Sequence, residues 1–294
     1  MSSQYPQWPS DGRDPFFVAA PPQPHMRNRY WLHLGLFIVT LVSATFVVAG
    51  WPPNWGMGLL YGIPLVVILL CHEMGHYLMC RRYRVPATLP YFIPFPLSIF
   101  GTMGAVIRMK QITGRKALFD IGIAGPLAGL LITLPVTYFG LQLSEVRGTG
   151  GLPDGVLTLG EPLLFQWLSH LALGPLPADA DVVLHPMAFA GWAGFFVTSL
   201  NLLPAGQLDG GHVIHAMTPK LSHKISWLTL LGLAITAWFF SGWWFVVILV
   251  FFIGLRHPPV ADTEELGQSR IWMGFLALII FFLTFTPHPF GNIP

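Results

Sequence analysis

The chain has 294 residues, of which 53% are hydrophobic and only 10% are charged, and its formal net charge is +2. A soluble domain usually carries about 25% charged residues, so the deficit indicates a membrane protein. The small net charge excludes the strong basic excess typical of nucleic-acid binding. Cys71 and Cys80 are nine residues apart on one predicted helix. At about 1.5 Å per residue that is roughly 13 Å, too far for a disulfide.

Residues 1–29 are rich in Pro, Ser and Gln and are expected to form a disordered cytoplasmic tail. Apolar runs of about 20 residues then follow, the length that suits a bilayer core. The predicted spans are 30–50, 57–80, 117–140, 187–204 and 271–286. The first begins too far from Met1 for an ordinary signal peptide, so we interpret it as a retained anchor.

The stretch 225–255 is apolar for 31 residues, which is long for one helix and short for two, with Ser241 and Gly242 in its middle. We therefore predict an all-α polytopic membrane protein, a bundle of six to seven transmembrane helices. A single transmembrane domain is expected over residues 30–286, followed by a short tail at 287–294.

The loops between these spans differ in charge. Residues 81–116 carry seven basic residues, whereas residues 141–186 carry one, Arg147, against five acids. Since basic residues accumulate on the cytoplasmic side, the N-terminal tail and the segments 81–116 and 205–224 are predicted to be cytoplasmic. The acidic 141–186 loop is then predicted to lie outside.

The cytoplasmic 81–116 segment is apolar but broken by four prolines, so it cannot form a spanning helix. Its "TMGAVIRM" stretch alternates weakly and is partly β-branched, which favours a short β segment in the loop after the second helix. The alternative is an interfacial loop without a role in function.

The stretch "LLCHEMGHYLMC", residues 69–80, places ionisable groups inside an apolar run. His72 and His76 are four residues apart and share a helix face, and Glu73 stands beside that face. This is the H-E-x-x-H pattern, in which two imidazoles hold zinc and the glutamate acts as general base. The alternative is a pair of buried structural histidines. Because ionisable residues inside a membrane are costly, the functional interpretation is favoured.

Catalytic zinc usually has three protein ligands, so a third is needed. The other four glutamates lie outside or in the loop before the last span, at the wrong depth. Asp209 follows the fourth span and is predicted to lie at the same cytoplasmic depth as His72 and His76. It is the candidate third ligand, and the alternative is an aspartate that serves a Pro/Gly turn.

Four further ionisable residues are given no part in the site. We interpret Asp120 as a helix-end residue and His33 as interfacial. His212 and His215 are interpreted as solvent-facing rather than as supports for the ligands.

Together, "HEMGH" and "NLLPAGQLDGG" resemble the site-2 protease family of intramembrane zinc metalloproteases. The matching positions of the second motif are Asn201, Pro204, Asp209 and Gly210, and "GTMGA" (101–105) and "GPLAG" (125–129) also resemble family segments. The resemblance covers roughly residues 55–215, the expected core. It is nearest to the compact bacterial and plastid-type branch, without PDZ or CBS domains.

The resemblance implies a protease that cuts a transmembrane segment of another membrane protein, in a bacterial inner membrane or a plastid-type membrane. Zn²⁺ would be held by His72, His76 and Asp209, and Glu73 would be the catalytic base. Asn201 would hold the substrate backbone or the developing oxyanion, or would only bond between helices. The strand at Gly101, Thr102 and Gly104 would bind the unwound substrate as an added strand. The expected partners are the bilayer and the substrate, and not nucleic acid.

Three other functions stay open on the sequence alone. A metal-ion transporter would use the His/Asp site as a transient binding site for the ion, but no second ligand cluster is evident across the membrane. An inactive scaffold would bind spanning helices, although the base and ligand set are complete. A membrane zincin acting on soluble substrates would need a glutamate on a cytoplasmic helix as its third zinc ligand, and the sequence has no suitable glutamate.

Overall fold

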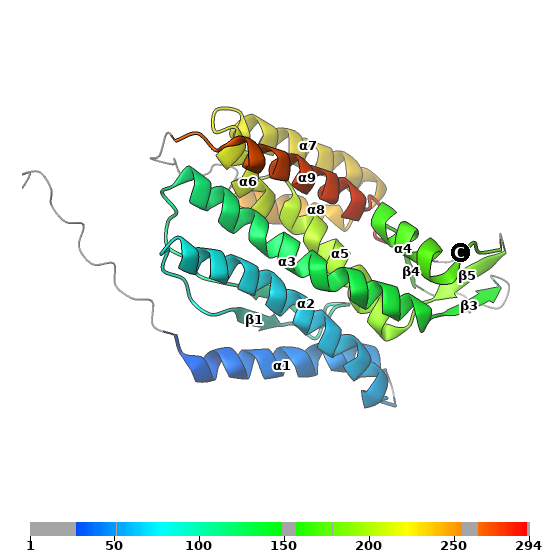
Figure 1. Cartoon of the computed structure of the whole chain (residues 1–294). Helices are drawn as coiled ribbons and strands as arrows, with labels where there is room; N and C mark the ends of the chain where they lie inside the picture. The colour runs from blue at the N-terminus through cyan, green and yellow to red at the C-terminus, as the bar shows by residue number, and fades with distance from the viewer. Residues whose placement is uncertain (1–27, 51, 149–156, 178, 255–263, 293–294) are drawn as a thin grey trace, which may run out of the picture.

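The computed structural model describes residues 28–50, 52–148, 157–177, 179–254 and 264–292, and this part is mostly helical (Figure 1). All but two residues of the predicted disordered tail therefore lie outside the described residues. Cys71 and Cys80 are free thiols, as their spacing predicts.

Three helices are long and apolar enough to cross a membrane: α1 (Tyr30–Ala49), α2 (Trp55–Arg82) and α3 (Arg115–Gln142). They coincide with the first three predicted spans. Figure 1 shows α2 and α3 side by side over most of their length, while α1 lies below α2 and diverges from it toward its own N-terminus.

The remaining helices are shorter: α4 (Leu163–Leu173), α5 (Pro186–Leu202), α6 (Asp209–Met217), α7 (Ser222–Phe239), α8 (Trp243–Ile253) and α9 (Gln268–Thr284). At about 1.5 Å per residue the 17 residues of α5 reach about 26 Å, less than the hydrocarbon core of about 30 Å. The ambiguous 225–255 stretch is split between α7 and α8, which separate around Ser241 and Gly242. The described helices thus support a membrane protein, and the count of six to seven spans stays a prediction.

The predicted β segment after the second helix is present as a hairpin. Strands β1 (Tyr91–Pro94) and β2 (Thr102–Val106) pair antiparallel, with Tyr91 opposite Val106. The hairpin contacts α1 and α2 and lies between them where they diverge (Figure 1).

Four further strands were not predicted, because they are only three or four residues long. β3 (Glu145–Gly148) pairs with β5 (Ala180–Val183), and β4 (Leu157–Leu159) pairs with β6 (Phe290–Asn292). With α4 they gather at one end of the helices (Figure 1). The predicted C-terminal tail therefore contributes a strand to this end.

An aromatic cluster ties the hairpin turn to the helices. Phe100 stacks on Trp192 and Phe189 of α5 at 6.3 Å between ring centroids. Tyr61 of α2 stacks on Phe189 at 5.1 Å and donates a hydrogen bond to the Phe100 carbonyl over 3.2 Å. The turn between β1 and β2 is thereby fixed to α2 and α5.

Asp120 does more than end a helix. Near the start of α3 it pairs with Arg270 of α9 over 2.8 Å and accepts a hydrogen bond from the Tyr83 hydroxyl at the end of α2. These contacts join three helices at the end where both sequence motifs lie.

Candidate metal centre

Two histidines of α2 face α3, and both are only 4% exposed. α3 makes room for them with the glycines of its "GPLAG" segment. A Cβ on Gly125 would lie 2.0 Å from His76 Nε2, and one on Gly129 would lie 3.2 Å from His72 Cβ. Small residues let helix backbones approach closely in membranes, and here they also leave space for two imidazole rings.

The proton position on His76 follows from its partner. Its Nδ1 lies 2.8 Å from the Ile121 carbonyl oxygen, which can only accept a hydrogen bond. Nδ1 therefore carries the proton, and in the neutral ring Nε2 offers a lone pair. A metal-binding histidine is commonly oriented by a carbonyl in this way.

Asp209 is the first residue of α6, and this short helix is held at both ends. At its start a Cβ on Gly210 would lie 2.1 Å from the Leu202 carbonyl oxygen, so only glycine allows this approach. At its end Arg115 of α3 donates from Nε to the Ala216 carbonyl over 2.5 Å and from Nη2 to the Met217 carbonyl over 2.9 Å. These contacts fix the direction from which the Asp209 carboxylate reaches α2.

The three candidate ligands meet. Asp209 Oδ2 lies 3.2 Å from Nε2 of both histidines, and the two Nε2 atoms are 3.1 Å apart. Zinc–ligand bonds of 2.0–2.1 Å in a tetrahedron place ligand atoms about 3.3 Å from each other. The donor spacing and the donor types therefore fit a zinc ion with one position left open.

Glu73 stands outside this triangle, as a base would. It is 7% exposed, and the backbone of Ile107, directly after β2, lies beside its carboxyl group. The hairpin thus reaches the Glu73 side of α2. Asn201, at the end of α5, places Nδ2 at 3.2 Å from His72 Nε2, so its amide stands at the edge of the ligand group.

The three residues of the predicted substrate strand differ. Gly101 has φ 72° and its carbonyl accepts a hydrogen bond from Ser43 Oγ over 2.6 Å, and the Thr102 hydroxyl donates to the Ile93 carbonyl over 2.8 Å. Gly101 is therefore tied to α1, and Thr102 ties β2 to β1. Gly104 has φ 97° and nothing within 4 Å of a Cβ position.

One expectation about the histidines was wrong. His215 is 8% exposed rather than solvent-facing, and its Nδ1 lies 2.8 Å from Ser222 Oγ. His33 is covered by the hairpin, and its place at the membrane interface stays a prediction. The contributions of Arg115 and of the Ile107 and Ile121 backbones were missed, since neither a single arginine nor a main-chain group forms a motif.

Comparison with known proteins identifies a family and named relatives. The profile of peptidase family M50 matches residues 61–241. The chain is 32% identical over 235 residues to the probable zinc metalloprotease EGY1, chloroplastic, of Oryza sativa subsp. japonica. This alignment covers 77% of this chain and 40% of the relative. It is 33% identical over 237 residues to the Arabidopsis thaliana EGY1, covering 78% of this chain and 42% of the relative.

The chain thus spans about two fifths of the length of these relatives. No solved structure matches it. The profile match includes both sequence motifs and the three residues that converge in space. The chain belongs to peptidase family M50.

Proposed function

We propose that this chain is an intramembrane zinc metalloprotease that hydrolyses a peptide bond within or near a transmembrane segment of another membrane protein. The observation that carries the proposal is the convergence of His72, His76 and Asp209 within 3.2 Å of one another. The names of the relatives, which describe probable zinc metalloproteases, support the same metal and reaction.

A zinc ion held by these ligands would polarise the scissile carbonyl and make water a nucleophile near neutral pH. Glu73 takes a proton from the attacking water and returns it to the leaving amide nitrogen. The Ile107 backbone lies beside the Glu73 carboxyl group. The Asn201 amide donates a hydrogen bond to the oxygen on which negative charge develops.

The substrate must expose its backbone before it can be cut, because a helix satisfies its carbonyls internally. The hairpin is the candidate partner of this segment: β2 carries Gly104, which has nothing within 4 Å of its Cβ position, and the backbone of Ile107, directly after β2, lies beside Glu73. An unwound substrate segment adds to this strand and passes the base.

The test compares the wild type with Glu73→Gln on a synthetic transmembrane peptide that carries a helix-breaking Asn-Pro pair. The amide cannot act as a base, so cleavage falls by about 10²–10⁴-fold while bound zinc stays near one per chain. Glu145→Gln is the matched control, because Glu145 is exposed at the far strand-rich end. A wild type without zinc, or a Glu73→Gln enzyme within tenfold of wild type, contradicts the assignment.

The proposed orientation places the N-terminus and the metal centre toward the cytoplasmic side. It follows from the seven basic residues in 81–116 against the acidic 141–186 loop. A reporter fused after residue 116 should read cytoplasmic, and one inserted near residue 155 should read external. The reverse pattern would overturn the orientation and leave the chemistry untouched.

A further inference from the structure

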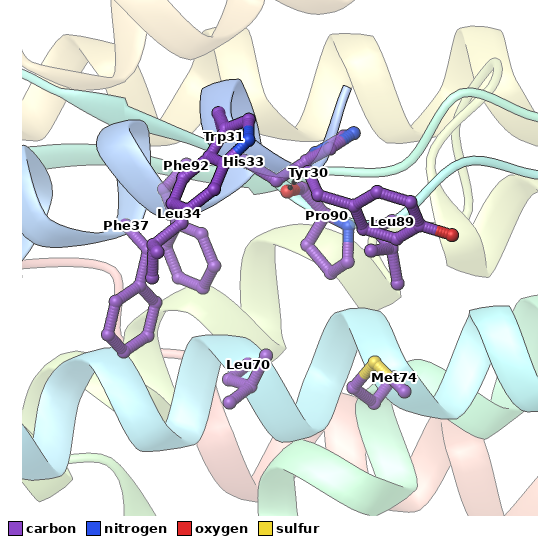
Figure 2. A pocket seen from close by; sticks show the side chains of 10 residues that line it. All are labelled: Tyr30, Trp31, His33, Leu34, Phe37, Leu70, Met74, Leu89, Pro90 and Phe92. Atoms are coloured by element: carbon purple, nitrogen blue, oxygen red, sulfur yellow. Dashed lines mark hydrogen bonds between the residues drawn. The ribbon is translucent and has the colours of Figure 1, made fainter. Parts of the chain in front are cut away.

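An open apolar groove of about 550 Å³ lies between α1 and α2, on the side away from α3 (Figure 2). Leu34 lines it from α1, Leu70 and Met74 from α2, and Pro90 and Phe92 from the hairpin side. The groove exists because the hairpin keeps the two helices apart at this level.

Tyr30, Trp31 and His33 bring polar atoms to this apolar groove, and His33 is the buried one of the three. His33 is 6% exposed, and its Nε2 is buried with no hydrogen-bond partner among the described residues. Its Nδ1 lies 3.0 Å from the Pro90 carbonyl oxygen, which can only accept, so Nδ1 carries the proton. In the neutral ring Nε2 is then a hydrogen-bond acceptor. Buried polar atoms are normally paired, so this acceptor calls for a donor that is not among the described residues.

Glu73 does not line the groove, but it lies next to a residue that does. It is three residues from Leu70 and therefore neighbours Leu70 on the helix surface, between the groove and the two histidines. His72 and His76 instead face α3. An occupant of the groove therefore lies on the Glu73 side of α2, where the hairpin also reaches Glu73 through Ile107.

We infer that this groove is a substrate subsite that holds an apolar side chain of the unwound segment while a backbone N–H of that segment donates to His33 Nε2. The inference rests on the proposed function. The chemistry is complementary on both sides: unwinding in hydrocarbon leaves N–H groups without partners, and the groove offers an acceptor without a donor. The acyl chains and ester carbonyls of phospholipids have no donor and cannot satisfy this nitrogen.

The kinetic test uses a substitution that fills the groove with a larger side chain and leaves the metal centre unchanged. Leu34→Trp should raise KM for the synthetic transmembrane peptide at least fivefold, with kcat within twofold of wild type and zinc unchanged. Leu32→Trp is the matched control, because Leu32 is on the same helix, 44% exposed against 49% for Leu34, and does not line the groove. Equal KM values for the two variants contradict the inference.

A second variant separates the two ring nitrogens. In His33→Asn the side-chain amide can still donate to the Pro90 carbonyl, but no atom replaces Nε2. Loss of one hydrogen bond should lower kcat/KM about three- to tenfold. Unchanged kcat/KM contradicts a role for Nε2.

Photo-cross-linking makes the result independent of turnover. A benzophenone amino acid at position 34, in the Glu73→Gln background, should capture the peptide in phosphatidylcholine/phosphatidylglycerol vesicles, and the same probe at position 32 should not. Adducts with lipid alone at position 34 would overturn the inference. If the wild type does not cut the peptide, the proposed protease function fails, whereas cross-linking still decides whether the groove binds a polypeptide.

Discussion

Helix α2 contacts α3 on one face and α1 on the other, and the two contacts are built differently. Against α3 the backbones touch: a Cβ on Gly75 would lie 2.4 Å from the Ala124 carbonyl oxygen. Against α1 the approach is equally close only at one end, where a Cβ on Gly58 would lie 2.4 Å from the Thr45 carbonyl oxygen. Toward the metal centre α1 and α2 separate around the hairpin (Figure 1).

The difference assigns separate tasks to the two faces. Lipid is as apolar as the helices, so association in a membrane depends on close packing and hydrogen bonds. The α3 face has both, including the His76–Ile121 hydrogen bond, and so holds the ligands in one geometry. The α1 face keeps an apolar groove that has room for a ligand. Substitutions on the α3 face should therefore abolish metal binding, and those on α1 should leave it intact.

The largest effect is expected for Gly125→Ala on the α3 face. The new Cβ would lie 2.0 Å from His76 Nε2, so the ring must move and the ligand triangle opens. Zinc content, measured by mass spectrometry of the purified protein, should fall below about a tenth of the wild-type value, since catalytic geometry tolerates only about 0.5 Å. Gly232→Ala in α7, with nothing within 4 Å of its Cβ position, is the control and should keep its zinc. Full zinc in Gly125→Ala would remove the glycine from the site.

The next effect concerns Asp209 itself. In Asp209→Asn a neutral amide replaces the carboxylate, and an amide is a poor zinc ligand. Loss of a residue that only supports a ligand lowers metal affinity by about 10–100-fold. Loss of the ligand itself should lower the zinc affinity further. If Asp209 served only its turn, asparagine would replace it well. Competition with a chromogenic chelator measures the affinity, and a value equal to wild type would leave the metal with a different third ligand.

A smaller effect should follow from releasing the far end of α6. Arg115→Met removes the donors to the Ala216 and Met217 carbonyls, so Asp209 is held less firmly and zinc dissociates about tenfold faster. Lys116→Met is the matched control, because Lys116 pairs with Glu264 at the surface. Arg115→Lys restores one donor and should give an intermediate rate. Equal zinc dissociation rates in the Arg115 and Lys116 variants would confine Arg115 to general stability.

The sequence predicted what depends on periodicity and on rare residue patterns. The first three spans follow from long apolar runs, and the meeting of Asp209 with His72 and His76 was inferred from their common depth. The break near Ser241 was visible but not decisive, because 31 apolar residues fit neither one helix nor two.

What the sequence did not predict depends on long-range packing. The strands that pair β3 with β5 and β4 with β6 join segments far apart in the chain, and each is too short to show alternation. Burial of His33 and His215 depends on what folds over them, namely the hairpin and the Ser222 turn. Arg115 donates hydrogen bonds to two carbonyls at the end of α6 that are about 100 residues away in sequence. Local sequence patterns cannot predict such a long-range contact.

The smallest effect is expected on α1, and it tests whether the two faces of α2 are independent. Gly35 lies in the exposed part of α1 with nothing within 4 Å of its Cβ position. Because glycine in a helix interior costs about 0.5–1 kcal/mol relative to alanine, Gly35→Ala should leave stability equal or slightly raised. Zinc per chain and the zinc dissociation rate should match wild type, since no ligand contact passes through α1. Thermal unfolding in detergent and the chelator assay measure the two quantities side by side. If Gly35→Ala instead speeds zinc loss as Arg115→Met is expected to, α1 is coupled to the ligand triangle, and the groove and the metal centre cannot be treated as separate parts of the site.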